Sequence, residues 1–519
     1  MPVGEDFGPR AVANWRLWLQ QRYSTLEALN DAWGTAFWGQ RYGDWEHVVA
    51  PAATPTIANP AMKLDWARFT DDQAPRVLPH RTRRHPPGSR TSPSPPTSWR
   101  TSRGTLTCGS GPRRLTSSRT TTTCGPLTPM RTWASRSPLT SRAPWVVAPR
   151  GSSWSTRGSA VNWQGRNVAK RPGEERRNAL THVGRGADGI LFFQWRASRS
   201  GAEKFHSAML PHAGKDSRVF REVTQLGQHM KDLAEVRGSR VVADVAVLYD
   251  WESLWAHDLE WRPSDDMQFR ERMRAYYERL WLDDVTVDFA HPEADLSGYR
   301  LVVAPSSYLL TSAAGENLSA YVAGGGTLLV GAFSGIVDEH DAVHVGGFGA
   351  PLKDALGLTV EEFLPLREGE TCEVVFDGTA LTVDAWAEDI ALAGAEVRGS
   401  FAGGPGDALP AVTRHQHGEG TGWYVGARLT PEALAPVIAQ VYADAGITPE
   451  GVAEGLETIT RRGAHHDFVI AVNHREDAVS LSITGTEPAE RYRDRRNARP
   501  QGRGRSRRPH REGAAGGGA

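Results

Sequence analysis

A regular alternation of strand and helix patterns between residues 241 and 330 constrains the fold more than any other feature of this sequence. Short apolar runs typical of buried strands alternate there with stretches of helical periodicity. The strand patterns cover residues 241–249, 285–289, 301–304 and 327–330, and the helical patterns cover 269–281 and 312–322. Strands that alternate with helices predict a doubly wound parallel sheet. We therefore expect a flavodoxin-like or amidotransferase-like α/β domain over residues 236–448.

This α/β region shows no chemistry of its own in the sequence. The three glycines at 324–326 follow a helix and precede a strand, which is the wrong order for phosphate binding at a helix N-terminus. Cys372 does not lie at a strand-to-helix elbow, so a thiol nucleophile is not expected. Residues 249–252 follow a strand and could reach a neighbouring site, but a helix-capping loop is the favoured interpretation.

Polar and aromatic residues gather directly after an earlier apolar run, at 190–193. This run predicts a fully buried strand. In α/β barrels the active site lies at the C-terminal ends of such strands. Trp195 could stack on a sugar ring, and Glu203 and His206 could hold sugar hydroxyls. The alternative is a rim loop whose charges only pair with one another.

The sequence of this stretch, ILFFQWRASRSGAEKFHSAMLPHAG, resembles a segment of glycoside hydrolase family 42, the β-galactosidases. The similarity extends to SAVNWQGRNVAKRPGE (159–174), to WLQQRYSTLEALNDAWGTAFWGQRY (18–42), and through GGGTLLVGAFSGIVDEHD to about residue 365. The resemblance implies hydrolysis of terminal non-reducing β-D-galactose residues by a retaining mechanism with two carboxylates. It implies no cofactor and no metal. It assigns substrate contacts to Trp38, Trp163, Glu203 and His206.

The same resemblance implies the architecture. Residues 1–235 would form the later part of a (β/α)8 TIM barrel, and residues 236–448 would form a trimerisation domain that makes the protein a homotrimer. Residues 449–490, which alternate apolar and polar side chains, predict a small β-sandwich. The basic, glycine-rich residues 491–519 are expected to be disordered, either as a nucleic-acid-binding tail or after a slip of the reading frame.

The segment between Asp72 and Glu174 contains no aspartate or glutamate and lacks hydrophobic periodicity. It could be a basic disordered linker or a nucleic-acid-binding arm. Codon arithmetic favours a different explanation, in which residues 76–157 are translated out of frame. Four threonines at 120–123, read one base earlier, encode only Asn, Asp, His or Tyr, and the family has an NDHY segment there. If Ser155 is encoded by AGC, Trp154-Ser155-Thr156 read likewise gives (Met or Leu)-Glu-His, which resembles the family's nucleophile segment.

The frame hypothesis predicts that no catalytic carboxylate is intact. The nucleophilic glutamate would be lost near Trp154 and Ser155, and the family's acid/base glutamate would lie upstream of Met1. Because a closed barrel needs all eight strands over roughly 250 residues, we also expect about the first 230 residues to fold poorly. The chain would then be an impaired or inactive β-galactosidase. The alternative is a non-catalytic remnant that still binds sugar or oligomerises.

Composition and the N-terminal pattern complete the expectations. Formal charge is balanced, with 60 basic and 60 acidic residues, which gives no reason to expect nucleic acid as a partner. A membrane span and a secretory signal are not expected, so the interpretation is a cytoplasmic protein whose partner is a β-galactoside. Residues 9–22 and 26–33 predict two helices, the second with a Ser24–Glu27 capping box. Trp33, Phe37 and Trp38 are more typical of a core than of a ligand platform.

Overall fold

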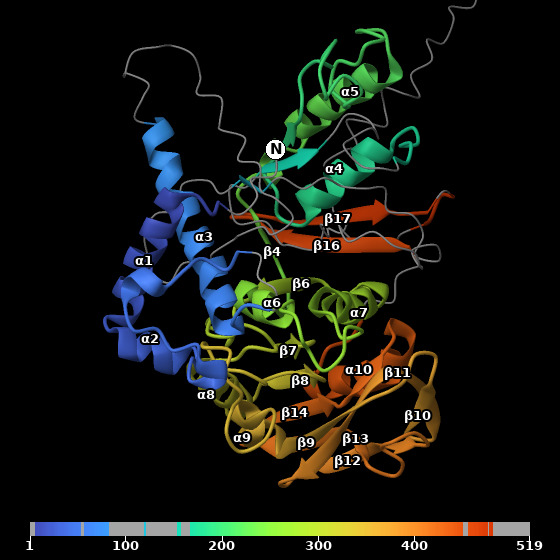
Figure 1. The fold of residues 1–519 in the computed structure, drawn as a ribbon. Helices are drawn as coiled ribbons and strands as arrows, with labels where there is room; N and C mark the ends of the chain where they lie inside the picture. Colours follow the sequence, from blue (N-terminus) through green and yellow to red (C-terminus); the bar gives the residue numbers. More distant parts are fainter. Residues whose placement is uncertain are drawn as a thin grey trace, which may run out of the picture.

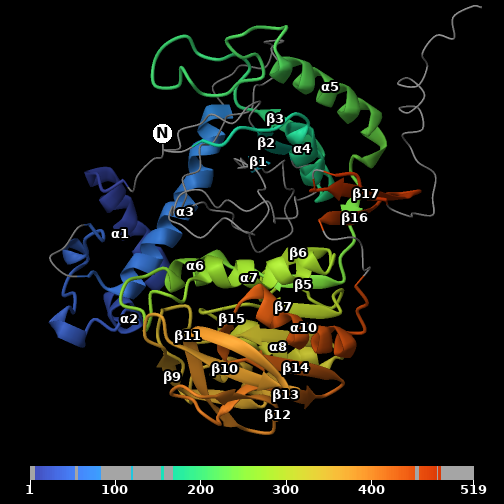
Figure 2. The same cartoon turned by 90° about the vertical axis from the view of Figure 1, so that its right-hand side faces the viewer.

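The structure, a computed structural model, describes residues 6–52, 57–82, 167–449, 455–475 and 477–480, and the backbone of two short strands at 119–120 and 153–156. In Figure 1 an α/β domain (yellow to orange) lies below a smaller layer of helices and strands, and a group of N-terminal helices (blue) lies along one side. Figure 2 shows the same three parts from the side, with the blue helices again beside the domain. Within the described residues, no helix is long and apolar enough to cross a bilayer.

The α/β domain is built on one mixed sheet with the strand order β15-β11-β10-β12-β13-β14-β8-β7-β5-β6, and β9 pairs with β11 outside this path. One half is parallel and consists of β5 (Val245–Leu248), β6 (Val287–Ala290), β7 (Leu301–Ala304), β8 (Thr327–Gly331) and β14 (Gly420–Val425). The other half is antiparallel and consists of β9 (Leu358–Pro365), β10 (Thr371–Phe376), β11 (Thr379–Leu392), β12 (Glu396–Ala402), β13 (Pro410–His417) and β15 (Ala427–Leu429).

The prediction of a doubly wound parallel sheet is confirmed for the parallel half. It is wrong for the other half, where the strands are antiparallel. Successive residues of β7 point into two different cores, Val303 into one and Val302 into the other. Both faces are therefore covered, as parallel sheets require. β10 alternates exposed and buried residues instead, which is the pattern of an antiparallel sheet with one face towards water.

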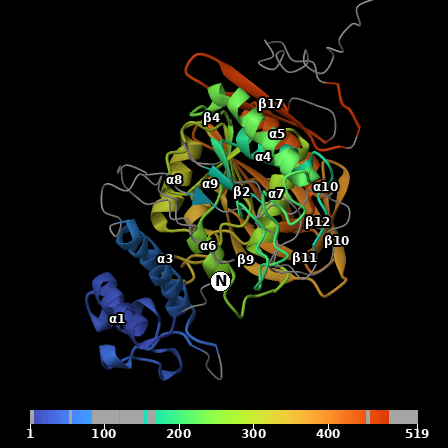
Figure 3. The same cartoon turned by 90° about the horizontal axis from the view of Figure 1, so that it is seen from above.

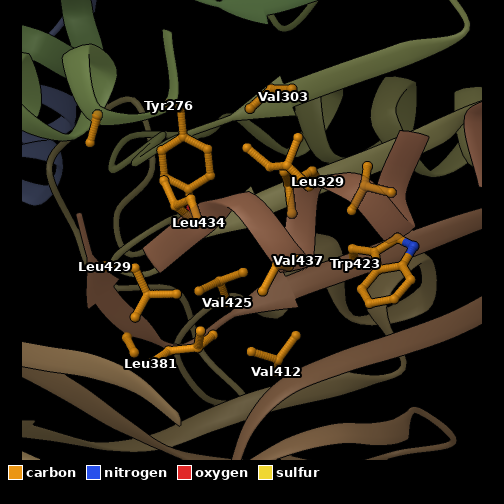
Figure 4. Packing of buried hydrophobic residues seen from close by; sticks show 14 of the residues in the cluster. Tyr276, Val303, Leu329, Leu381, Val412, Trp423, Val425, Leu429, Leu434 and Val437 are labelled. Atoms are coloured by element: carbon orange, nitrogen blue, oxygen red, sulfur yellow. The ribbon is translucent and has the colours of Figure 1, made fainter. Parts of the chain in front are cut away.

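Helices cover both faces of the parallel strands. On one face, α7 (Phe269–Leu282) and α10 (Pro431–Ala445) pack together and close a core that continues beneath the antiparallel strands. Figure 4 shows this core, with Tyr276 and Leu434 from the helices pointing towards Leu329 and Val425 of the sheet. On the other face, α8 (Ser312–Ala323), η5 (Ala350–Leu352) and α9 (Lys353–Leu356) close a second core.

The upper layer contains the stretch that resembles the end of a barrel. Three parallel strands, β1 (Arg119–Thr120), β2 (Ser153–Thr156) and β3 (Gly189–Phe192), lie in this order, accompanied by α4 (Glu174–Gly184) and α5 (Arg218–Asp232). The prediction of a fully buried strand at 190–193 is wrong, because all four residues of β3 are only half-buried. The strand itself is present, one residue earlier than predicted.

A C-terminal hairpin joins the upper layer to the α/β domain. Strand β16 (Leu456–Arg462) pairs with β17 (Asp467–Asn473) on one side and with β4 (Arg240–Val241) on the other, and α4 packs against β16 and β17. The strand predicted at 241–249 is therefore divided between two sheets, since β4 belongs to the hairpin sheet and β5 to the large one. Figure 3 shows α4, α5 and β17 above the α/β domain, with α1 and α3 to the side. The described part of the predicted sandwich forms this one sheet, and its remainder lies outside the described residues.

The N-terminal helices enclose a core of their own. Helices α1 (Pro9–Tyr23), α2 (Leu26–Ala32) and α3 (Pro60–Thr82) bury a cluster of aromatic side chains around Trp15 and Trp33. The two predicted helices are confirmed, but Thr25 rather than Ser24 caps the second by accepting a hydrogen bond from the backbone N–H of Ala28. Of the predicted disordered segment 76–157, the structure describes the end of α3, which continues to Thr82, and the strands at 119–120 and 153–156, and a fully disordered segment is wrong at these positions. The rest of this segment and the basic tail lie outside the described residues.

Candidate active site

The loop after β3 carries the two polar residues assigned to sugar binding. Backbone hydrogen bonds close this loop at its base, because the N–H groups of Met209 and Leu210 donate to the carbonyl oxygens of Gln194 and Trp195, each at 2.8 Å. The intervening residues form turns at the C-terminal end of β3. The chain thus places this loop where α/β barrels build their active sites.

Glu203 and His206 lie in one turn of this loop. The backbone N–H of His206 donates to the carbonyl oxygen of Glu203 at 2.8 Å, which holds the two residues together. The His206 ring is buried, lies edge-on to Phe193 at 4.9 Å, and places Nδ1 2.9 Å from the carbonyl oxygen of Ser207. Glu203 is half-buried. His206 is therefore oriented by its neighbours, and the backbone hydrogen bond keeps Glu203 in the same turn.

The rim offers an exposed aromatic ring and an amide beside this pair. Trp195 is 61% exposed, and its ring lies edge-on to Phe220 at 6.3 Å between ring centroids. Gln194 follows the strand directly, and its buried Nε2 has no hydrogen-bond partner within the described residues. These groups match the kind of surface that binds a sugar ring, with one flat face and unsatisfied polar atoms.

The strand beside β3 lacks the carboxylate that the chemistry needs. Residues of β2 pair with β3 so that Trp154 lies opposite Ile190 and Ser155 opposite Leu191. These are the two positions at which the sequence predicted the lost nucleophile. Retaining glycosidases need two carboxyl groups about 5 Å apart. Since no aspartate or glutamate occurs between Asp72 and Glu174, neither β1 nor β2 can supply one.

The other two predicted sugar contacts are not brought to this rim. Trp163 lies outside the described residues. Trp38 lies in η1 (Phe37–Gly39), which follows α2; in Figures 1 and 2 α2 lies at the lower end of the blue helices, and the green loop after β3 lies at the top. The core interpretation of the aromatic triplet holds for Trp33, which is buried, but is wrong for Phe37 and Trp38, which are 67% and 58% exposed.

A buried polar network at the base of α3 was not predicted from the sequence. The Asp65 carboxylate accepts hydrogen bonds from the Tyr23 hydroxyl (2.5 Å), from Trp33 Nε1 (2.9 Å) and from Arg68 Nη1 (2.8 Å). Burial and the nearby Asp65 charge raise the pKa of Tyr23 to about 12. Arg68 also pairs with Glu252 of α6 (Trp251–His257). Because Arg68 lies between these carboxylates, the network joins two parts of the molecule and does not resemble a glycosidase pair.

Asp341 lies near the same junction and is unusual for a carboxyl group. Burial raises its pKa to about 7, with the Asp338 charge adding to the rise and Arg68 opposing it. One of its oxygens, Oδ1, is buried without a hydrogen-bond partner among the described residues. A carboxyl group in this position titrates near neutral pH.

Other positions considered in the sequence have structural roles. Asp250 caps α6 by accepting hydrogen bonds from the backbone N–H groups of Glu252 and Ser253, at 3.1 and 3.0 Å. Residues 249–252 thus form a capped helix start, as favoured. Cys372 is buried on β10, where burial raises the pKa of its thiol. No group of three or more His, Cys, Asp or Glu side chains suitable for a metal ion occurs within the described ranges.

Comparisons with known proteins give one consistent likeness. Residues 243–448 match the family model described as β-galactosidase trimerisation domain, and residues 2–84 and 136–233 match the model described as β-galactosidase. A β-galactosidase from Arthrobacter sp. is 38% identical over 494 residues, which cover 93% of this chain and 70% of that protein. A β-galactosidase from Geobacillus kaustophilus is 38% identical over 490 residues, covering 93% and 72%.

Solved structures agree with these relatives. The β-galactosidase from Rahnella sp. R3 has a TM-score of 0.77 at 27% identity, covering 91% of this chain and 72% of that chain. The β-galactosidase from Bacillus circulans sp. alkalophilus has a TM-score of 0.76 at the same identity and coverage. The likeness therefore extends over both the upper layer and the α/β domain.

Proposed function

The chain belongs to glycoside hydrolase family 42, the β-galactosidases, and from this premise we propose that it binds β-galactosides through the rim after β3 but lacks an intact hydrolytic centre. By family it is a glycoside hydrolase with a TIM-barrel-like α/β fold and a trimerisation domain. The single observation that supports the incomplete centre is the pairing of β2 with β3, because β2 carries Trp154 and Ser155 and no carboxylate.

The proposed binding step uses the residues of the rim. Glu203 would accept hydrogen bonds from sugar hydroxyls, and His206 would donate or accept one according to its tautomer. Trp195 offers an apolar ring for the flat face of the galactose, and the resemblance adds Trp163 and Trp38 as contacts. A retaining mechanism needs one carboxyl group as nucleophile and another as general acid/base, in addition to the groups that bind the sugar. Glu203 therefore cannot replace the nucleophile while it binds the sugar hydroxyls.

The proposed defect lies in the displacement at the anomeric carbon. In a retaining mechanism a carboxylate attacks this carbon and forms a galactosyl-enzyme, which water then hydrolyses with help from the second carboxyl group. A tryptophan and a serine at the rim of β2 offer no carboxylate for the attack. The rim can therefore bind a galactoside without cleaving it.

An activated substrate tests this proposal. A 2,4-dinitrophenyl β-galactoside has a leaving group that needs no proton, so its cleavage reports the nucleophile alone. We expect no release of dinitrophenol above background from this chain. A chain with residues 76–157 restored to the other frame should acquire the mass of one galactosyl unit, as seen by mass spectrometry of the intact protein.

The matched control is the frame-restored chain in which the restored glutamate is replaced by glutamine, which should not acquire the sugar. Hydrolysis by the present chain that Glu203→Gln abolishes would contradict the proposal, because the rim would then contain a working nucleophile. The coding sequence gives an independent check, and an uninterrupted frame without a hidden glutamate codon at Trp154-Ser155 would remove the frame hypothesis.

A second function, self-assembly, is favoured by a different observation. The trimerisation match covers the same residues as the two dense cores of the α/β domain. We therefore propose that the chain forms a homotrimer even when it does not hydrolyse galactosides. Sedimentation equilibrium of the purified chain should give three times the monomer mass, and a monomer at micromolar concentration would refute this.

A further inference from the structure

A cavity of about 370 Å³ lies between β3 and the helices α4 and α5, and we call it the β3–α5 cavity. Its strand wall is formed by Ile190 and Phe192, which are two positions apart and therefore point to the same face of the strand. Every residue of β3 is only half-buried. Figure 2 shows these three elements together at the top of the molecule. The strand thus has an apolar face with open space beside it.

Helix α5 forms the opposite wall of the cavity. Its apolar lining residues, Val223, Leu226, Met230 and Leu233, are spaced three and four positions apart and form one stripe on the helix. Gly227 lies in the same stripe, and a Cβ added there would meet no atom within 4 Å. Because Gly227 is also exposed, the cavity opens to solvent beside it. The second wall is therefore apolar too, and a small molecule can enter.

The charged residues among the described lining gather at one end of the cavity. They are Asp188, Arg237 and Arg461, so two positive charges and one negative charge leave a net charge of +1. Asp188 directly precedes the strand and accepts hydrogen bonds from Arg461 Nη2 at 2.9 Å and from the backbone N–H of Gly238 at 3.0 Å. This end therefore lies at the start of β3. Met209, in the loop after the strand, lines the other end.

Arg461 is fully buried, and one of its donors is not used. Nη1 and Nη2 donate to three carbonyl oxygens and to Asp188. Nε is buried without a hydrogen-bond partner within the part of the chain that the structure describes. A buried donor without a partner is unfavourable, and an acceptor placed beside it would remove this cost. An acceptor with a negative charge also matches the net positive charge of the lining.

The walls and the charged end together decide between possible occupants. Water does not suit the apolar walls, because buried water needs several polar partners. A neutral hydrocarbon suits the walls but leaves Nε of Arg461 without an acceptor. A polypeptide segment would bring backbone N–H and C=O groups, for which the apolar walls offer no partners. A hydrocarbon tail that ends in an anionic acceptor matches both parts of the cavity.

We propose that the β3–α5 cavity binds a small amphipathic carboxylate, with its hydrocarbon tail between β3 and α5 and its carboxylate at Arg461 and Arg237. The site is separate from the rim after β3, and its ligand belongs to a different chemical class from a galactoside. The proposal therefore does not depend on the proposed function.

Calorimetric titration of the full chain with hexanoate, octanoate and decanoate, each below its micelle-forming concentration, tests the proposal. One molecule should bind per chain, and the affinity should rise about fourfold for each added methylene group, the usual effect of burying one. Decyltrimethylammonium should bind about tenfold more weakly than decanoate, because its charge has the same sign as the lining. Absence of saturable decanoate binding would overturn the proposal, and so would equal affinities for the carboxylate and the ammonium ion.

A substitution at Gly227 tests whether the ligand occupies this cavity. Gly227→Leu places a side chain in the open space and should abolish saturable binding of decanoate. Gly227→Ala is the matched control, since it adds a single methyl group and should retain binding. Alanine and leucine are both favoured over glycine inside a helix, so neither variant should melt at a lower temperature than the unaltered chain. Unchanged decanoate affinity in Gly227→Leu would place the ligand elsewhere and overturn the proposal.

A substitution at Arg237 tests the charged end without disturbing the buried Arg461. The Arg237 side chain is exposed, so Arg237→Gln should weaken decanoate by at most about fivefold. The same variant should leave the affinity for decanol unchanged, because decanol has the same tail and no charge. Equal weakening of both ligands would show that Arg237 acts through the fold and not on a carboxylate, which would overturn the assigned orientation.

Hydrogen exchange locates the bound ligand along the chain. Decanoate should slow exchange in α5 and at the amide of Met209, and exchange in α8 of the α/β domain should not change. Slower exchange that excludes α5 would overturn the proposal. If Gly227→Leu dissociated an oligomer of the unaltered chain and decanoate did not bind, the cavity would be a contact between copies of the chain and not a ligand site.

Discussion

Two parallel strands of four residues, β3 and β7, have similar apolar sequences and different environments. All four residues of β7 are buried, because β5 and β8 flank the strand and helices close a core on each face. All four residues of β3 are half-buried, with β2 as its neighbour and a cavity of about 370 Å³ between the strand and helices α4 and α5. An apolar run therefore predicts a strand, whereas its burial depends on the elements around it.

The two regions differ in where their partners lie in the sequence. The strands and covering helices of the α/β domain all lie within residues 243–448, and this continuous segment has the apolar patterns of buried strands and helices. In the upper layer, β1 and β2 come from the segment without acidic residues, and the C-terminal hairpin packs against α4. A region that depends on distant or altered segments is expected to be the less stable of the two.

The largest expected effect concerns Arg461 of β16, which holds α4 and the turn before β3 against the C-terminal hairpin. This fully buried side chain donates hydrogen bonds to the carbonyl oxygens of Val183, Ala187 and Ser239 and pairs with Asp188 at 2.9 Å. Arg461→Ala removes the cation that pairs with Asp188 and the donor to three carbonyl groups, which costs about 3–5 kcal/mol. Hydrogen exchange should show loss of protection in α4 and β16, with the strands of the α/β domain still protected.

The neighbouring Arg462 provides the control for this prediction. Its side chain is 51% exposed and pairs with Asp467 at 3.1 Å. Arg462→Ala should leave stability almost unchanged, as is usual for exposed pairs. Equal loss of protection in both variants would show that Arg461 does not hold α4 on the hairpin in the way its hydrogen bonds indicate.

Leucine truncation measures the contrast between the strands directly. Leu329 on β8 is fully buried in a continuous core, and Leu191 on β3 is half-buried. Leu329→Ala should cost about 3 kcal/mol, the usual value for a well-packed core, whereas Leu191→Ala should cost about 1 kcal/mol or less. Thermal unfolding followed by circular dichroism compares them, and a larger effect at Leu191 would mean that β3 is as well packed as the large sheet.

Asp341 should make stability depend on pH near neutrality. Its folded pKa of about 7 lies above its ordinary value of about 4, so the folded chain holds a proton that the unfolded chain has released. Stability therefore falls as pH rises between these values, by about 1.4 kcal/mol per pH unit. Asp341→Asn should remove this slope and stabilise the protein by on the order of 2 kcal/mol at pH 8.

Melting temperatures at pH 5 and pH 8 test this effect. Asp295→Asn is the control, because Asp295 is exposed and its pKa is lowered by hydrogen bonds from Ser297, which leaves nothing to titrate in this range. A pH slope that persists unchanged in Asp341→Asn would assign the dependence to other groups.

Periodic patterns predicted local elements well and long-range pairing poorly. The segments 301–304 and 312–322 agree with β7 and α8. A strand buried on both faces is a continuous apolar run, and a half-buried helix repeats its apolar residues with the helical period, so both patterns can be recognised locally. The predicted strand at 241–249 divides into β4 and β5 because Val241 pairs with Arg461, about 220 positions away. No local pattern carries that pairing. Strand β10 alternates exposed and buried residues, which is the pattern of an antiparallel strand with one face towards water.

The candidate site divides in the same way. Glu203 and His206 lie in the predicted loop because the strand that precedes them has a clear apolar pattern. Their role in sugar binding stays a prediction. The β3–α5 cavity was not predicted, because its lining combines the segment around β3 and α5 with Arg461 from the distant C-terminal hairpin. The Asp65–Arg68–Glu252 network was not predicted because Arg68 and Glu252 are 184 positions apart in the sequence and meet only when α3 packs on α6.

The smallest effect comes from replacing glycine by alanine in each of two helices. Gly227 lies in α5, where a Cβ would meet no atom within 4 Å, and Gly315 lies in α8, where a Cβ would lie 2.6 Å from the carbonyl oxygen of Pro351. Alanine is favoured over glycine inside a helix by about 1 kcal/mol. Gly227→Ala should therefore stabilise the upper layer by about 0.5–1 kcal/mol, measured by hydrogen exchange of α5. Gly315→Ala should destabilise the α/β domain, since the backbone of Pro351 must move. If both variants gained stability, α8 would not be densely packed against residue 351. The claim that the α/β domain is packed more densely than the upper layer would then fail at this helix.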